Sequence, residues 1–382
     1  MAVARPRIFL FALNAQVSVV TGELLMVTGT LGRVQSPRII RIGGAAKETA
    51  EVLEQLGLSR PLIITDAKVA NLHLSTLTDV LDGAGMVWGL FDQVVEDPTD
   101  VCVDAGLAAL QSGDYDCVVG FGGGSPMETA KAVSFMSVNS EHVRDYKEPA
   151  QIDRCGVPII LIPTTGGTGS VLTRWCVITD TESPENYYLS GLACVATAAI
   201  IDWSFSLTKP ARITANTAVD SLTHAIEAYV SRRAFPYTDA FALSAAQAGM
   251  AFSNASVALV HGMSRPIGAH FHVAHGLSNA MLLPTVTSFS VAAAPARYSA
   301  RARIMDMAED GDTDATACAK LVDGLRSLNT DLAVPSPRAL GHDADEAMLE
   351  IMAQQALETG SPNNNPRVPT KEEIGGLHKE IW

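Results

Sequence analysis

Short apolar runs alternate with amphipathic segments through the first half of the chain. Each run is rich in β-branched or other apolar residues; they span 61–66, 85–91, 115–124, 157–165 and 193–202. Runs of this length without polar alternation are typical of parallel strands buried on both faces, and the segments between them have helical spacing. The pattern therefore predicts a mainly parallel sheet covered by helices on both faces.

The pattern changes after residue 202. From there onward the segments are rich in Ala, Leu and Met with helical spacing, and none of them has the pattern of a strand. A chain of 382 residues is long enough for two hydrophobic cores. We therefore expect an N-terminal extension over 1–37, an α/β domain over 38–204 and an all-α domain over 205–382.

Composition narrows the range of partners. The formal charge of −14 argues against nucleic acid and against an anionic membrane surface, because both select a basic protein surface. No apolar stretch reaches the length of a membrane span. The six cysteines lack CxxC spacing, which is typical of free thiols in a reducing compartment. We expect a cytoplasmic protein, with a mitochondrial presequence within residues 1–37 as the alternative.

Two glycine-rich turns follow predicted strands. The first, "GGGSPMETAKAV" at 122–133, would let a phosphate approach the backbone at a helix N-terminus, where free N–H groups point outward. Its alternative interpretation is an ordinary helix start, with Ser125 as N-cap, Pro126 at the first helical position and Glu128 completing a capping box. The second turn, "PTTGGTGS" at 163–170, adds threonine hydroxyls. Together they suggest one ligand that contains phosphate and ribose.

Asp66 closes the apolar run "PLIITD". A carboxylate after such a strand can bind a ribose diol and repel a 2′-phosphate, which favours NAD over NADP. A helix N-cap is an equally simple role for the same aspartate.

A possible metal site lies in the second half of the chain. Asp220 and His224 are four residues apart with helical spacing and share one helix face. His261 closes one helical run and His275 opens another, and Pro266 and Gly268 are expected to break the chain between them. One carboxylate and three imidazoles would leave an open position on Fe²⁺ or Zn²⁺ for a substrate oxygen.

Two further histidines lie in the same stretch. We expect His272 to line the substrate pocket and His270 to be structural.

Taken together, these segments resemble the iron-containing (group III) alcohol dehydrogenase family over roughly residues 38–382. The matching motifs are "GGGSPMETAK", "PTTGGTGS", "DSLTHAIEAYVS" and "HGMSRPIGAHFHVAHGLSNAMLLP", in the family's order. The resemblance implies a dehydroquinate synthase-like fold, an α/β N-terminal dinucleotide-binding domain plus an all-α C-terminal metal-binding domain. It implies Asp220, His224, His261 and His275 as metal ligands. It implies cofactor contacts at Asp66, Gly123, Gly124, Ser125, Thr164, Thr165, Thr168 and Thr173.

The sequence departs from the family pattern near the cofactor. Glu128 stands where the family has Asp, Val171 where Glu is usual, and Asn186 where a lysine approaches the cofactor. Arg265 replaces a histidine near the nicotinamide, so we count Arg265 and His272 as candidate catalytic residues. Proton transfer would then run through water, a ribose hydroxyl or His272. Arg265 could bind an anionic substrate tail, or it could pair with a nearby acid.

One segment is shorter than in the family. The stretches 237–245 and 246–262 abut where the family has an additional helix. Because the expected ligands flank this junction, a missing helix could displace His261 from Asp220 and His224.

The sequence thus predicts a metal-dependent, NAD-linked alcohol dehydrogenase or aldehyde reductase that acts on a small alcohol or aldehyde. Fe²⁺ is the expected metal and Zn²⁺ the alternative. A catalytically impaired homologue with a missing helix, or a zinc-dependent relative similar to glycerol dehydrogenase, are the competing interpretations. A small-molecule substrate is the expected partner, and the resemblance makes a homodimer plausible.

Overall fold

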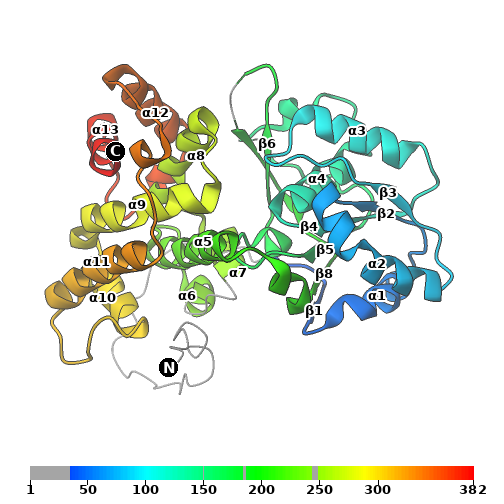
Figure 1. Ribbon diagram of the computed structural model, residues 1–382, viewed down its shortest axis with the longest axis horizontal. Coiled ribbons are helices and arrows are strands. Elements are labelled where there is room, and N and C mark those ends of the chain that lie inside the picture. The colour runs from blue at the N-terminus through cyan, green and yellow to red at the C-terminus, as the bar shows by residue number, and fades with distance from the viewer. Residues whose placement is uncertain (1–34, 149, 184–185, 243–247) are drawn as a thin grey trace. The chain divides into compact units, whose positions relative to one another are not determined.

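The computed structural model describes residues 35–148, 150–183, 186–242 and 248–382 (Figure 1). The expected N-terminal extension, apart from its last few residues, lies outside them. Six strands form one sheet: β1 (Ile39–Ile42), β2 (Pro61–Ile64), β3 (Gly89–Phe91), β4 (Cys117–Gly122), β5 (Ile159–Pro163) and β8 (Ala198–Ile201). Their order is β1-β8-β5-β4-β2-β3, and every neighbouring pair is parallel. The predicted parallel sheet is confirmed, and β1 is an additional strand.

Successive residues of the central strands pack into different cores. Val118 and Leu161 belong to the same apolar cluster as Phe135 of α4. Val119 and Ile160, their neighbours in sequence, belong to the cluster on the opposite face. Helices α3 (Asp100–Gln111) and α4 (Gly124–Met136) cover the first face, and α1 (Thr49–Gln55) and α2 (Ala67–Gly83) cover the second. Burial on both faces explains why these strands are continuous apolar runs.

The chain leaves the sheet in opposite directions after two neighbouring strands. From β2 it continues to β3 at one edge, whereas from β4 it continues to β5 and β8 toward the other. In open α/β sheets, ligands bind outside the carboxyl ends of the strands at such a switch point. Asp66 follows β2, and Gly123 follows β4. The topology therefore places both residues at the edge where a ligand is expected.

An antiparallel hairpin interrupts the α/β pattern. Strands β6 (Trp175–Thr179) and β7 (Asn186–Ser190) pair with each other in a separate two-stranded sheet. Both strands lie outside the five apolar runs from which the sheet was predicted, so the sequence pattern did not predict the hairpin. Cys176 and Ile178 point into the protein, and their neighbours are partly exposed.

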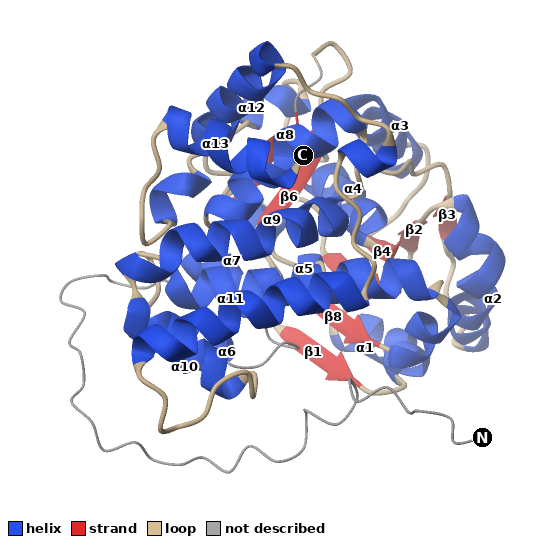
Figure 2. Ribbon diagram, turned by 60° about the vertical axis from the view of Figure 1, so that its left-hand side comes forward, coloured by secondary structure: helices blue, strands red, loops and turns tan. Residues whose placement is uncertain are grey.

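The rest of the chain is helical. Its α-helices among the described residues are α5 (Ala211–Val230), α6 (Pro236–Ala242), α7 (Ala248–Ala255), α8 (Leu259–Phe271), α9 (His275–Ser290), α10 (Pro295–Ile304), α11 (Asp314–Asp331), α12 (Glu346–Glu358) and α13 (Lys371–Ile381). In the described part of 205–382 there is no strand, so the predicted all-α half is confirmed (Figure 2). No described helix is both long enough and apolar enough to cross a bilayer.

The boundary near residue 204 stays a prediction. It is consistent with the end of β8 at Ile201 and the start of α5 at Ala211.

The predicted chain break at Pro266 is wrong. Helix α8 continues through this proline to Phe271, and His261 lies in its first turn rather than at the end of a helix. A proline inside a helix removes one hydrogen bond and costs about 3 kcal/mol. Complete burial of Leu259, Met263 and Ile267 on one face of α8 outweighs that cost. His275 does begin α9, as expected.

The junction of the shortened segment, at 243–247, lies outside the described residues.

Candidate metal and nucleotide site

Helix α5 presents a row of buried polar side chains to α8 and α9. Asp220 and His224 are one turn apart on this helix, 1% and 4% exposed, so their placement requires polar partners. The Nδ1 of His224 lies 3.8 Å from Oδ1 of Asp220. Nε2 of His261 on α8 is 3.6 Å from the same oxygen, and Nε2 of His275 on α9 is 3.7 Å from it. The structure thus gathers all four expected ligands around one carboxylate oxygen.

These distances fit a divalent metal ion. Asp220, His224 and His261 each offer a ligand atom, and the three atoms lie within 4.8 Å of one another. Ligands about 2.1 Å from a tetrahedral ion are roughly 3.4 Å apart, slightly closer than the 3.6–3.8 Å seen here. The separations are too long for hydrogen bonds, so the imidazoles face the carboxylate without bonding to it. The side chain of His275 is 46% exposed and forms the open side of the cluster.

Asn279 gives independent support for a cation at this position. It lies one turn after His275 on α9 and is buried. Its Nδ2 is 2.7 Å from Oδ1 of Asp220, 3.3 Å from Nε2 of His261 and 3.2 Å from Nε2 of His275. An amide group has two hydrogens, so three acceptor atoms converge on a donor that can satisfy two of them. Such a convergence of acceptors is the electrostatic environment that a metal ion requires.

Glu227 holds His261 from the other side. It follows His224 by three residues on α5, and its Oε2 lies 2.6 Å from Nδ1 of His261. The same carboxylate accepts the backbone N–H groups of Ala258 and Val260, which precede and begin α8. A proton on Nδ1, donated to Glu227, leaves Nε2 of His261 as the acceptor that faces Asp220. Glu227 therefore fixes both the tautomer of His261 and the start of its helix.

The sequence interpretation missed both Glu227 and Asn279. The signal was present, because Glu227 shares the helix face of Asp220 and His224, and Asn279 shares that of His275.

Electrostatics keep the carboxylate charged and one imidazole neutral. Burial alone would raise the pKa of Asp220, but its electrostatic interactions with the three facing histidines, that with His224 first, hold it well below its usual range. Burial lowers the pKa of His224 to about 3, against the attraction of Asp220. Burial also opposes a charged His261, yet Glu227 and Asp220 together raise its pKa.

The expected nucleotide-binding segments lie at one edge of the sheet. Asp66 follows β2, Gly123 and Gly124 follow β4, and Thr164 and Thr165 follow β5, three neighbouring strands. The N–H of Thr164 donates to the carbonyl of Gly122 across a distance of 2.8 Å. Asp66 caps α2 by accepting the N–H groups of Lys68 and Val69 through Oδ1. The capping role considered for Asp66 is therefore real.

The start of α4 differs from the prediction. Gly123, not Ser125, is the N-cap, and no side chain caps the helix. Ser125 lies too far inside the first turn for that role, and Glu128 instead accepts a hydrogen bond from Ser170. The first N–H groups of α4 are consequently free of side-chain acceptors within the described residues, as a phosphate site at a helix N-terminus requires.

The threonines of the second loop differ in their surroundings. Oγ1 of Thr165 is buried without a hydrogen-bond partner among the described residues, whereas Oγ1 of Thr168 accepts the N–H of Ser170. Thr173 is 2% exposed, and its hydroxyl contacts Lys131. A cofactor contact is thus better supported for Thr165 than for Thr173.

Lys131 ties this loop to α4. Its fully buried Nζ donates to the carbonyls of Ser170, Thr173 and Trp175 at 2.8–3.0 Å. Burial lowers the pKa of this amine. A single lysine therefore fixes the whole segment that leads from the second loop into β6.

Two glycines bring the expected nucleotide-binding edge and the expected metal ligands together. A Cβ at Gly167, whose φ is +141°, would lie 2.1 Å from the carbonyl oxygen of Thr217 on α5, one turn before Asp220. A Cβ at Gly276 would lie 2.4 Å from the carbonyl oxygen of Asn216. Only glycine permits either approach. The second loop and the start of α9 are therefore both held against the helix that carries Asp220.

The remaining candidates lie on α8. Arg265 follows His261 by four residues and stacks on Tyr188 of β7, with its guanidinium carbon 3.8 Å from the ring centroid. His272 is exposed and ends α8 in a left-handed conformation. His270 contacts Gln355 of α12 at 2.8 Å, consistent with the structural role expected for it.

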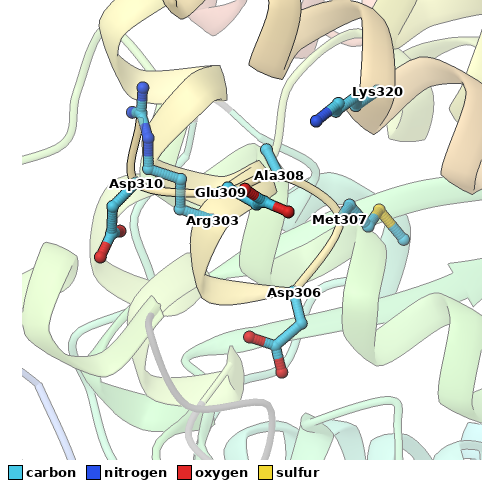
Figure 3. A pocket seen from close by; sticks show the side chains of 7 residues that line it. All are labelled: Arg303, Asp306, Met307, Ala308, Glu309, Asp310 and Lys320. Atoms are coloured by element: carbon cyan, nitrogen blue, oxygen red, sulfur yellow. The ribbon is translucent and has the colours of Figure 1, made fainter. Parts of the chain in front are cut away.

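A surface hollow of about 460 Å³ lies elsewhere, around the turn after α10 (Figure 3). Its lining contains none of the candidate residues. Its two basic side chains, Arg303 and Lys320, are paired with Asp314 and Asp312. We assign no function to it.

Comparison with known proteins identifies the family. The family described as iron-containing alcohol dehydrogenase matches residues 36–203, and the C-terminal part of the Fe-containing alcohol dehydrogenase family matches residues 214–248 and 241–382. The chain belongs to the iron-containing alcohol dehydrogenases. It is accordingly an enzyme of the alcohol and aldehyde oxidoreductase class. The second match falls into two pieces that meet at the shortened segment, yet His261 remains close to Asp220.

Named relatives support this assignment over most of the chain. Lactaldehyde reductase of Escherichia coli K12 is 32% identical across 89% of this chain and 96% of its own length. The NAD-dependent methanol dehydrogenase of Bacillus methanolicus is 31% identical across 88% and 96%. Two solved structures, a 1,3-propanediol oxidoreductase and the alcohol dehydrogenase from Oenococcus oeni, each have a TM-score of 0.88, with 28% and 26% identity. Each covers 92% of this chain and is matched over 100% of its own.

Replacing Lys131 with Met should destabilise the protein by about 3–5 kcal/mol, because several buried carbonyls lose their donor at once. Urea unfolding measures the difference. Lys379→Met, which removes an exposed ion pair with Glu346, should cost less than about 1 kcal/mol. Equal losses in the two variants would contradict the role given to Lys131.

The contribution of Glu128 to stability should depend on pH. Desolvation raises its pKa from 4.5 to about 7, so the folded protein disfavours the charged form. Stability from this group is therefore complete below pH 4.5 and is lost as the pH rises through about 7. Glu128→Gln should stabilise the protein more at pH 8 than at pH 5, measured by urea midpoints at both values. If the difference in urea midpoint between Glu128→Gln and wild type is the same at pH 5 and pH 8, the raised pKa of Glu128 is wrong.

Glu227→Gln should weaken divalent-metal binding by about 10- to 100-fold, because the amide no longer fixes the tautomer of His261. Competition with a chelator measures the affinity. Glu350→Gln, at an exposed position of α12, is the matched control and should leave affinity unchanged. Wild-type affinity in Glu227→Gln would show that this carboxylate only stabilises the start of α8.

Proposed function

We propose that this enzyme is a metal-dependent, NAD-linked alcohol dehydrogenase that interconverts a small alcohol and its aldehyde. The main support is the gathering of His224, His261 and His275 within 3.6–3.8 Å of one oxygen of Asp220. These four residues would hold the metal. The nucleotide would bind at the carboxyl edge of β2, β4 and β5, which Gly167 holds against the same helix.

Fe²⁺ is the metal we propose. One carboxylate and three imidazoles suit both iron and zinc, and membership of an iron-containing family favours iron. When bound, the ion supplies a Lewis acid that stabilises negative charge developing on the alcohol oxygen. The protein's own contribution is the fixed geometry. Glu227 holds one imidazole, and Gly276 lets α9 bring another to Asp220.

The proposed cofactor is NAD rather than NADP. Asp66 uses Oδ1 for both of its capping bonds, so Oδ2 can accept a ribose hydroxyl while the charge repels a 2′-phosphate. The pyrophosphate would bind at the first N–H groups of α4, beside Gly123, Gly124 and Ser125. Thr164, Thr165 and Thr168 would contact it from the second loop, and Thr173 would act through the loop that Lys131 fixes.

The reaction transfers two electrons. When bound, NAD would supply the acceptor for the hydride of the alcohol carbon, and the overall reaction would give aldehyde, NADH and one proton from the alcohol oxygen. We propose that His272, exposed at the end of α8, passes that proton to solvent. A cytoplasmic location and a homodimer stay predictions.

The proposal is tested by separating the metal site from the nucleotide site. His261→Ala should lose its bound metal, measured by elemental analysis, while NADH fluorescence still reports nucleotide binding. It should also lose at least about 100-fold in kcat/KM on short aldehydes, because removing the metal removes its stabilisation of the reacting oxygen. His270→Ala, on the same helix but paired with Gln355, is the control and should keep its metal.

Each alternative predicts a different result. Equal loss of metal and NADH binding in His261→Ala would contradict the separate sites. A wild-type protein that binds metal and NADH but turns over no aldehyde or alcohol would be the catalytically impaired homologue. Activity restored to metal-free protein by zinc and not by iron would place it with the zinc-dependent relatives.

A further inference from the structure

The charges of three arginines act on one carboxylate, Glu148. Arg265 lies on α8, Arg174 precedes β6, and Arg233 follows α5. Burial raises the pKa of Glu148, and the charges of Arg265, Arg174 and Arg233 oppose that rise. The backbone N–H of Glu148 is bonded to the carbonyl of Tyr188 at 2.8 Å. The cluster therefore carries more positive than negative charge.

These guanidinium groups lack protein acceptors. Among the described residues, none of the three side chains forms a hydrogen bond or an ion pair, and Nε of both Arg174 and Arg265 is buried without a partner. Arg265 is positioned instead by the ring of Tyr188, 3.8 Å from its guanidinium carbon. Stacking holds the plane of the group and leaves its N–H edge available. A planar anion with two oxygens is the natural complement of that edge.

The cluster is adjacent to the metal site. Arg265 follows His261 by four residues on α8, and side chains with that spacing lie roughly 6 Å apart on one helix face. Burial lowers the pKa of Arg265, and the negative charge of Glu227, which holds His261, opposes that lowering. A chain of a few carbons could therefore join the two positions.

We propose that Arg265, helped by the charges of Arg174 and Arg233, binds the carboxylate of a substrate whose far end is the reacting carbon. The substrate class is short hydroxy acids and the corresponding ω-oxo acids. The inference rests on the proposed function, because it assumes that the reacting group lies at the Asp220 cluster. It accounts for an arginine that has no acid partner at 4 Å or less among the described residues.

The test compares aldehydes of equal length with and without a terminal carboxylate. Holoenzyme with NADH is assayed on the four- and five-carbon ω-oxo acids and on butanal and pentanal. The wild-type enzyme should have a higher kcat/KM on the ω-oxo acids than on the neutral aldehydes of equal length. Arg265→Met should lose about 10- to 100-fold more kcat/KM on the acids than on the neutral aldehydes, mainly through KM. Arg265→Lys keeps the positive charge but lacks the planar guanidinium group. Its preference for the acids should therefore lie between that of wild type and that of Arg265→Met.

Two controls keep the outcome clear. Arg326→Met removes an exposed arginine paired with Asp323 and should leave the acid preference unchanged. Arg233→Met removes an exposed member of the cluster and should reduce the preference a few-fold, which tests the inference even if Arg265→Met fails to fold. If Arg233→Met and Arg265→Lys both keep the wild-type preference for ω-oxo acids over neutral aldehydes, the inference is wrong.

Binding measurements distinguish the other sources of an anion. Calorimetry on the NADH complex should show butanoate binding more tightly than butanamide, and Arg265→Met should abolish that difference. If Arg265→Met weakens NADH binding while the preference for acids persists, the anion is a cofactor phosphate and the inference is wrong. If no aldehyde is turned over, the proposed function fails, but the comparison of butanoate with butanamide still decides the role of Arg265.

Discussion

The contact between Gly167 and Thr217 is the constraint on which the candidate site depends. A loop that follows β5 lies with its backbone directly on α5, so close that even one methyl group would collide with a carbonyl oxygen. The α5 helix also carries Asp220, His224 and Glu227. The sheet edge proposed to bind phosphate and the proposed metal ligands are thus positioned by the same helix. The backbone of Gly167 also acts on the pKa of His224, where it opposes the lowering that burial causes and ranks behind the charges of Asp220, His261 and His275.

Much of this arrangement could be predicted from local sequence. Continuous apolar runs required a sheet buried on both faces, and helical spacing put Asp220 and His224 on one face of a helix. The four proposed ligands come from three helices, so their convergence could not follow from spacing. It was expected from the resemblance of the motifs, and the structure supplies the reason, which is the close approach of α9 to α5 at Gly276.

Other features depended on interactions that the sequence does not display. Pro266 suggested a chain break, because the burial that keeps α8 intact comes from other helices. Ser125 suggested a helix cap, but the helix begins two residues earlier than that cap implies, and the serine falls inside it. Glu227 and Asn279 could not be recognised by residue type, because histidine is the more characteristic metal ligand, although the carboxylate and the amide contact the proposed histidine ligands directly. Which polar residues contact the proposed metal-binding histidines is decided by three-dimensional packing and cannot be read from residue type.

The pairing of β1 with β8 has a consequence for how the protein folds. Ile39 lies beside Ala198, about 160 residues away along the chain, so the first strand has no partner until most of the α/β half has been synthesised. Parallel pairings between such distant segments form slowly, since a long loop must close before any contact compensates for it. During translation β1 would remain an unpaired strand edge while the centre of the sheet assembles. Chaperone dependence and the rate of refolding are therefore expected to be set by this edge rather than by the helical half.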